Sequence, residues 1–265
     1  MAVDFLSQII ARKQQEVAQA QREIPEGSLL KATREGRERR PLLTALAAPG
    51  PAGANIIAEI KRASPSRGAI RPDLEPVQLA RAYEGGGAAA ISVLTERSFF
   101  QARPDDLQRV RNAVSLPVLR KDFILSPYQL YETAAMGADA VLLIVRALTG
   151  EMLRDLLDLC RDLSLDALVE VHSEAELASA TVAGATLIGI NNRDLTTFHT
   201  DLQTSMKLVG RLKGGQVAVA ESGIHHRAQV EELMAAGVWN FLIGESLVRA
   251  PDPARHLRGL LGQPG

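Results

Sequence analysis

Beyond Pro41 one hydrophobic pattern recurs, in which an amphipathic helical stretch ends at a Gly and a short apolar run follows. In one instance, Met136-Gly137-Ala138-Asp139 leads into the apolar run 140–145. Gly after a helix adopts a left-handed conformation that other residues resist, so it marks a helix end. Eight apolar runs are predicted as strands: 56–61, 89–94, 116–121, 140–145, 168–171, 187–190, 217–220 and 239–243.

Successive runs are spaced by roughly 20 to 33 residues, which leaves room for one helix between neighbouring strands. Near-continuous apolar strands that alternate with helices indicate a parallel sheet covered by helices, and eight units favour closure into a (β/α)8 barrel. The alternative is an open doubly wound sheet. No G-x-G-x-x-G follows the first strand, which disfavours the dinucleotide-binding version of that alternative.

The N-terminal segment 1–22 has apolar positions interrupted by charges and is predicted as an amphipathic helix. It resembles neither a signal peptide nor a membrane span, and no run approaches the length of a spanning helix. We therefore expect a cytoplasmic protein that does not bind membranes. The predicted organisation is one barrel domain over 1–265, with 1–40 as a helical extension over the barrel mouth.

The charge balance shapes what the protein can bind. The sequence holds 30 basic and 31 acidic residues, so no overall field favours nucleic acid, and a charged ligand must be recognised locally. The single cysteine, Cys160, lies in a leucine-rich helical pattern and is expected to be a buried apolar residue. A hydrophobic content of 46% is enough for a sizeable core.

Polar side chains stand where the predicted strands end, and in this fold the carboxyl ends of the strands carry the chemistry. Glu59 and Lys61 are two residues apart on one strand and therefore point to the same face. Burying both costs several kcal/mol unless they pair or serve a ligand. The other strand ends carry Lys121, Glu170, Asn191, Glu221 with Ser222 and Gly223, and Gly244.

Two lysines and three glutamates at one mouth shift each other's proton affinities, which supports proton-transfer chemistry. Gly223 and Gly244 follow the last two strands, where exposed backbone N–H groups usually hold a phosphate in this fold. The histidines show no ligand spacing, so no catalytic metal is expected.

Several motifs in order make the sequence similar to the indole-3-glycerol phosphate synthases, over essentially the whole chain. The motifs are Ala58-Glu59-Ile60-Lys61-Arg62-Ala63-Ser64-Pro65-Ser66, Arg120-Lys121-Asp122-Phe123-Ile124, Leu168-Val169-Glu170-Val171-His172, Gly189-Ile190-Asn191-Asn192-Arg193-Asp194-Leu195 and Ala220-Glu221-Ser222-Gly223-Ile224.

The resemblance implies a (β/α)8 barrel lyase of tryptophan biosynthesis that uses no cofactor. Its substrate would be 1-(2-carboxyphenylamino)-1-deoxyribulose 5-phosphate, which closes its ring and loses carbon dioxide and then water. The resemblance makes Lys121 the general acid that protonates the ketone oxygen. An ammonium there stabilises the developing negative charge, which can contribute a few kcal/mol in a site without water. Glu170 resembles a general base or the group that stabilises the cationic intermediate, with Glu59 its partner. Lys61 resembles the lysine of the dehydration step.

The remaining positions resemble contacts to the substrate. Asn191 and Ser222 match groups that hold the sugar hydroxyls, with Glu221 beside them. Other matches are Ser64 and Arg193 near the carboxylate and loop, Phe123, Leu142 and Leu195 around the aromatic ring, and Gly223 and Gly244 at the phosphate. The partner implied is a small phosphorylated substrate, and we expect a monomer or weak homo-oligomer.

Three alternatives stay open. The first is a sister phosphate-binding barrel, such as phosphoribosylanthranilate isomerase or the tryptophan synthase α-subunit. The isomerase needs a Cys near the first strand end, where Glu59 and Lys61 stand instead. A Schiff-base aldolase that uses Lys121 or Lys61 as nucleophile is the second. The third is an inactive barrel that serves as a binding or assembly module.

Overall fold

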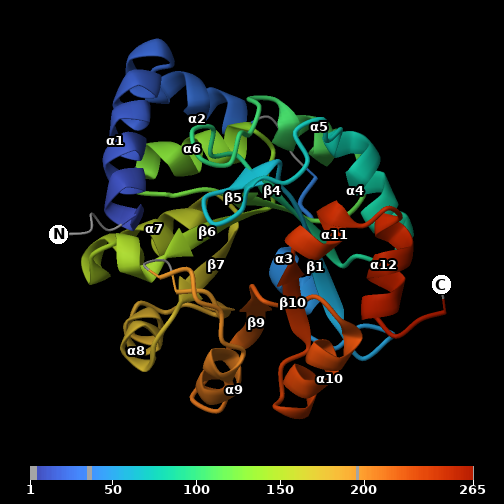
Figure 1. The fold of residues 1–265 in the computed structure, drawn as a ribbon. Coiled ribbons are helices and arrows are strands. Elements are labelled where there is room, and N and C mark those ends of the chain that lie inside the picture. Colours follow the sequence, from blue (N-terminus) through green and yellow to red (C-terminus); the bar gives the residue numbers. More distant parts are fainter. Residues whose placement is uncertain (1–4, 35–37, 195–196, 265) are drawn as a thin grey trace.

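The computed structural model describes residues 5–34, 38–194 and 197–264. Eight parallel strands close into a barrel in the order β1-β10-β9-β8-β7-β6-β5-β4, so that β1 pairs with both β4 and β10. Helices surround the strands (Figure 1). The predicted (β/α)8 barrel is confirmed.

The barrel strands lie within two residues of the predicted runs at each end. They are β1 (Asn55–Ile60), β4 (Ala90–Leu94), β5 (Val118–Lys121), β6 (Ala140–Ile144), β7 (Asp166–Val171), β8 (Leu187–Asn191), β9 (Val217–Glu221) and β10 (Asn240–Ile243). A short hairpin of β2 (Ala63–Ser64) and β3 (Gly68–Ala69) follows β1.

Helices precede β1, and a helix follows each barrel strand. They are α1 (Phe5–Glu23), α2 (Glu26–Arg34), α3 (Leu42–Leu46), α4 (Pro76–Gly85), α5 (Asp106–Ala113), α6 (Pro127–Ala135), the 3-10 turn η1 (Val145–Ala147), α7 (Gly150–Asp162), α8 (Glu174–Val182), α9 (Gln203–Val209), α10 (Arg227–Ala235), α11 (Glu245–Arg249) and α12 (Pro253–Leu260).

Each barrel strand divides its side chains between two apolar clusters, because successive side chains point to opposite faces. On β1, Ile56, Ala58 and Ile60 pack between the barrel and the helices, whereas Ile57 belongs to the cluster inside the barrel. The inner cluster also holds Leu119, Leu142, Leu168, Leu187, Val219 and Leu242. Residues two positions further along these strands therefore face the barrel mouth.

Helices close both ends of the barrel interior. At the amino-terminal end of the strands, Leu42 and Leu46 of α3 are fully buried in the inner cluster, and Asn240 Nδ2 donates to the Leu46 carbonyl at 3.2 Å. At the other end, Leu6 and Ile9 of α1 join the same cluster. Figure 1 shows α1 and α2 side by side with α6, which they contact. The residues of the predicted N-terminal helix that the structure describes, 5–22, are helical, and 1–4 lie outside the described residues.

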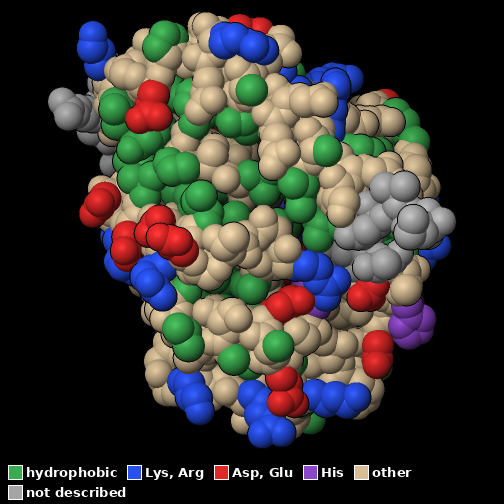
Figure 2. All heavy atoms as spheres, turned by 90° about the vertical axis from the view of Figure 1, so that its left-hand side faces the viewer, with side chains coloured by type: hydrophobic (Ala, Val, Ile, Leu, Met, Phe, Trp, Pro, Cys, Tyr) green, Lys and Arg blue, Asp and Glu red, His purple; other side chains and the backbone are tan. Residues whose placement is uncertain are grey.

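The surface and the cysteine agree with the sequence. Acidic and basic side chains are interspersed on the face in Figure 2, which shows the left-hand side of Figure 1. Cys160 lies buried on α7, and burial raises the pKa of its thiol to about 12. Among the helices that the structure describes, none is long and apolar enough to cross a membrane.

Candidate active site

Two adjoining hollows occupy the barrel mouth at the carboxyl ends of the strands. One hollow is lined by the apolar side chains of α1 and by polar strand ends, and the other lies over the ends of β9 and β10. Five side chains line both hollows: Glu59, Lys61, Lys121, Arg193 and Ser222. The structure thus brings the predicted polar residues together. Glu59, Lys61 and Lys121 continue the inward-facing series of their strands, and Arg193 and Ser222 lie just after the ends of β8 and β9.

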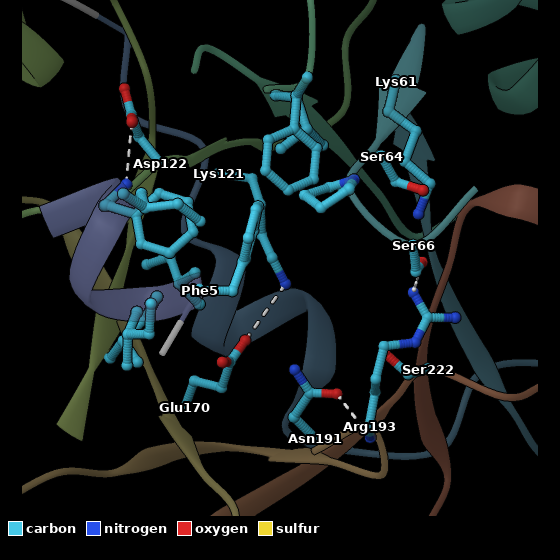
Figure 3. A pocket seen from close by; sticks show the side chains of 18 of the residues that line it. Phe5, Lys61, Ser64, Ser66, Lys121, Asp122, Glu170, Asn191, Arg193 and Ser222 are labelled. Atoms are coloured by element: carbon cyan, nitrogen blue, oxygen red, sulfur yellow. Dashed lines mark hydrogen bonds and ion pairs between the residues drawn. The ribbon is translucent and has the colours of Figure 1, made fainter. Parts of the chain in front are cut away.

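Lys121, the last residue of β5, reaches into the mouth toward Glu170 (Figure 3). Its Nζ pairs with Glu221 Oε2 and lies 3.6 Å from Glu170 Oε2. Burial favours the neutral amine, but the charges of Glu221, Glu170 and Glu59 outweigh it and raise the pKa of Lys121. Lys121 is therefore a cation at neutral pH, held where a reacting oxygen could meet it.

Glu221, the last residue of β9, differs from Lys121 because the site favours its neutral form. Burial raises its pKa to about 7, helped by the negative charges of Glu170 and Glu59 and opposed by Lys121. Its Oε1 has no hydrogen-bond partner in the described structure. A carboxyl group that titrates near neutral pH beside a fixed ammonium can exchange protons during a reaction.

Glu59 and Lys61 form an ion pair on the β1 side of the mouth. Burial disfavours the Glu59 carboxylate, but Lys61, Lys121 and Arg193 more than compensate and lower its pKa. Gly244, just after β10, lies against the pair, since a Cβ there would collide with the Glu59 carboxylate. The mouth therefore holds carboxyl groups of different proton affinity, as acid and base roles require.

An apolar wall completes the first hollow. Phe5, Leu6 and Ile9 of α1 form one side, and Phe123 and Leu142 form another. Phe5 packs edge-on against Phe99 with ring centroids 5.2 Å apart, and Phe100 lies near Phe123 at 6.4 Å. Such a wall fits a planar aromatic group.

The second hollow has the features of an anion site. Ser222 and Gly223 adopt left-handed conformations with φ of 67° and 80°, which turn the chain sharply after β9. Gly223, Gly244 and Ser246 line the hollow together with the cations Lys61 and Arg193. Backbone and cationic donors around a hollow suit a phosphate group.

Arg193 spans the two hollows and is held on both sides (Figure 3). Its backbone N–H donates to Asn191 Oδ1 at 3.0 Å, and its Nη1 donates to Ser66 Oγ at 3.1 Å. Ser66 belongs to the turn between β2 and β3, and Ser64 of the same hairpin is buried against the first hollow. The guanidinium is thus fixed in orientation, which suits recognition of a carboxylate or phosphate.

The structure places the predicted site residues as follows. Glu59, Lys61, Ser64, Lys121, Phe123, Leu142, Glu170, Asn191, Arg193 and Ser222 line the first hollow, and Glu221, Gly223 and Gly244 line the second. Leu195 lies outside the described residues. In the part of the chain that the structure describes, no three His, Cys, Asp or Glu side chains form a group that could hold a metal ion.

Sequence reasoning missed three contributors to the mouth. Phe198 lines the first hollow from a loop without periodicity. Lys13 reads as a polar position of an amphipathic helix, yet it lies buried against Asp122. Gly189 lies inside a strand, and a Cβ there would collide with the Glu221 carboxylate. A Gly within an apolar strand does indicate close approach by another group, and that signal could have identified Gly189.

Fold and mouth together define a barrel enzyme for proton-transfer chemistry on a phosphorylated small molecule. The family model described as indole-3-glycerol phosphate synthase matches residues 6–260. The chain belongs to the indole-3-glycerol phosphate synthase family, whose members are decarboxylating lyases of tryptophan biosynthesis.

Relatives agree with this assignment. An indole-3-glycerol phosphate synthase of Syntrophobacter fumaroxidans is 58% identical over 259 residues, which cover 98% of each chain. One from Desulfosudis oleivorans is 55% identical and covers 97% of this chain and 98% of its own. Among solved structures, thiamine phosphate pyrophosphorylase from Pyrococcus furiosus matches with a TM-score of 0.59 and 18% identity, over 78% of this chain and 93% of its own. That last likeness concerns the fold alone.

Proposed function

We propose that this mouth carries out the synthase reaction on 1-(2-carboxyphenylamino)-1-deoxyribulose 5-phosphate, with Lys121 as the general acid. The observation that carries the proposal is the position of the Lys121 ammonium between Glu170 and Glu221, beside an apolar wall on one side and an anion site on the other. The aromatic ring would lie against Phe123 and Leu142, and the phosphate over Gly223 and Gly244.

In the first step, the ring carbon that bears the carboxylate forms a bond to the ketone carbon, and the carbonyl electron pair moves to oxygen. Negative charge develops on that oxygen, and the Lys121 ammonium stabilises it and donates a proton. The raised pKa of Lys121 keeps this group charged until the oxygen becomes basic. Carbon dioxide then leaves, and its bonding electrons restore the ring.

Loss of water requires a base and an acid on the new five-membered ring. We assign Glu170 as the general base or the group that stabilises the cationic intermediate, with Glu59 as its partner. Lys61 then donates to the departing hydroxyl. Support for this division comes from Glu170 lying close to Lys121, while Glu59 pairs with Lys61 on the other side of the mouth.

The remaining residues would hold the substrate. Asn191 and Ser222 suit the sugar hydroxyls, with Glu221 beside them, because Asn191 and Glu221 end the neighbouring strands β8 and β9 and Ser222 follows β9 directly. Arg193, held by Ser66, suits the substrate carboxylate together with Ser64, which lines the same hollow. Leu195 keeps the role of a wall residue that the family resemblance implies.

We further propose that the chain acts as one barrel domain, a monomer or weak homo-oligomer, in the cytoplasm and without a cofactor. The closed barrel and the apolar interior that runs from α3 to α1 support a single domain.

Turnover of the carboxyphenylamino substrate to its fluorescent indole product tests the assignment. Lys121→Ala should lower kcat by about 100-fold or more, because a positioned general acid typically contributes that much. Lys213→Ala, at an exposed lysine, is the matched control and should behave as the parent. Unchanged turnover in Lys121→Ala would remove Lys121 from the chemistry. A covalent adduct trapped by borohydride would instead favour the aldolase alternative.

A further inference from the structure

A row of alternating charges extends from Glu170 away from the barrel mouth. Glu170 and His172 are two residues apart at the end of β7 and point to the same side. His172 Nε2 lies 3.5 Å from Glu170 Oε1, and His172 Nδ1 lies 3.1 Å from Glu176 Oε2 on α8. The His172 side chain is only 4% exposed, so this imidazole is sandwiched between two carboxylates.

Glu176 fixes the imidazole ring from behind. Its Oε2 also accepts the backbone N–H of His172 at 2.7 Å, and its Oε1 lies 3.1 Å from Arg146 Nε. Its own backbone N–H donates to Ser173 Oγ at the start of α8. Burial disfavours the Glu176 carboxylate, but the contacts with His172 and Arg146 lower its pKa, so it is ionised at neutral pH.

The ionised Glu176 determines which ring nitrogen carries the titrating proton. An ionised carboxylate can only accept hydrogen bonds, so His172 Nδ1 carries a hydrogen in both protonation states of the ring. The titrating proton therefore sits on Nε2, which is buried and has no hydrogen-bond partner in the described structure. Nε2 faces Glu170 Oε1, so a neutral ring would present a lone pair to a carboxylate, whereas a protonated ring presents a positive N–H.

The surrounding charges favour the protonated ring. Burial favours neutral imidazole, and Arg146 also opposes a positive charge, but Glu176 and Glu170 outweigh both and raise the pKa of His172. His172 does not line either hollow of the mouth. Its direct contact with a residue that lines the mouth is the one with Glu170.

We propose that His172 is a positioning residue whose imidazolium, held by Glu176, lies against the Glu170 carboxylate and orients it. The proposal rests on the role of Glu170 given under the proposed function. It extends the site by a relay of Glu176 and His172, in which Glu176 sets the tautomer of His172 and His172 presents its positive charge to Glu170.

His172→Gln tests the relay because glutamine retains an amide donor but removes the positive charge. The acidic limb of the kcat profile should move to higher pH by about one unit, since a cation this close lowers a carboxyl pKa by about that much or more. The variant should lose about tenfold in kcat on the acidic side of the limb and approach the parent on the alkaline side. KM should stay near the parent value, because His172 touches neither hollow.

Two further variants separate the possible outcomes. His256→Gln makes the same substitution on α12, outside both hollows, and should leave the profile of the parent unchanged. Glu176→Gln should shift the acidic limb in the same direction as His172→Gln, by weakening the imidazolium. A loss in His172→Gln that is equal at every pH, or an unchanged profile, would overturn the relay.

Nuclear magnetic resonance of the parent protein gives a test independent of turnover, with the His172 signal assigned by its absence in His172→Gln or by its shift in Glu176→Gln. The ring should carry its hydrogen on Nδ1 when neutral and should titrate above the usual histidine value. Titration below that value would contradict the proposal even if His172→Gln failed to fold. Glu170→Gln separates failure of the proposed function from failure of the relay. Full turnover in Glu170→Gln would remove the role of Glu170 itself, whereas a parental pH profile in His172→Gln would remove only the relay.

Discussion

Lys13 Nζ on α1 lies 2.9 Å from Oδ1 of Asp122, and Asp122 directly follows the proposed general acid Lys121 in the sequence. Both side chains are almost completely buried, at 7% and 2% exposed. Asp122 also accepts from Thr95 and from Arg120, and Lys13 pairs with Glu16 at 2.8 Å. This ion pair ties the helix that covers the barrel mouth to the strand end that carries the Lys121 ammonium.

Lys13→Met should loosen α1 over the first hollow and raise KM more than it lowers kcat. The free energy of unfolding should fall by about 2 kcal/mol, the scale of a hydrogen bond to a charged group. Asp122 keeps Arg120 and Thr95, which limits the loss. Steady-state kinetics and urea unfolding measure both effects. Lys31→Met, at an exposed lysine on α2, is the control, and a parental KM in Lys13→Met would show that the ion pair does not position the helix.

Gly189→Ala should impair catalysis although Gly189 bears no functional group. A Cβ on this residue would collide with the Glu221 carboxylate and contact Leu168 at 3.3 Å. Overpacking in a filled interior costs about 1 to 3 kcal/mol, and displacement of Glu221 would separate it from Lys121. Both kcat and the unfolding free energy should fall. Gly210→Ala, where a Cβ meets nothing within 4 Å, should do neither, and equal effects in the two variants would refute the argument.

Glu221→Gln should change how stability depends on pH. The folded-state pKa of Glu221 is raised to about 7, so folding favours its protonated form. The corresponding stabilisation is complete below the unfolded value of 4.5 and is lost as pH rises through about 7. The unfolding free energy of the parent relative to Glu221→Gln should therefore fall by roughly 3 kcal/mol over that range. Urea titrations at several pH values measure the difference, and a constant difference would contradict the raised pKa.

Arg193→Lys should raise KM by about tenfold with a smaller change in kcat, because lysine keeps the charge but loses the planar fork. The fork holds Ser66 in the parent and faces both hollows. Arg211→Lys makes the same change at a side chain that is 65% exposed and paired only loosely with Glu174, so it should have no effect. Parental KM in Arg193→Lys would argue against a role in substrate binding.

Much of this protein follows from its sequence because strands and helices have fixed periods. The apolar runs predicted the eight strands, and the two-residue period predicted that Glu59 and Lys61 share a face. The rule that chemistry lies at the carboxyl ends of barrel strands then selected Lys121, Glu170 and Glu221. These inferences need only the local backbone and the fold class.

Only the tertiary structure decided which side chains meet. Lys121 pairs with Glu221 from four strands further along the barrel order, Lys13 reaches Asp122 from outside the barrel, and Glu221 occupies the space left by Gly189. Such contacts depend on how the strands are staggered when the barrel closes and on how α1 docks, and neither is set by local periodicity. The same closure places His172 between Glu170 and Glu176, so the sequence by itself determined the candidates and the closed barrel determined their partners.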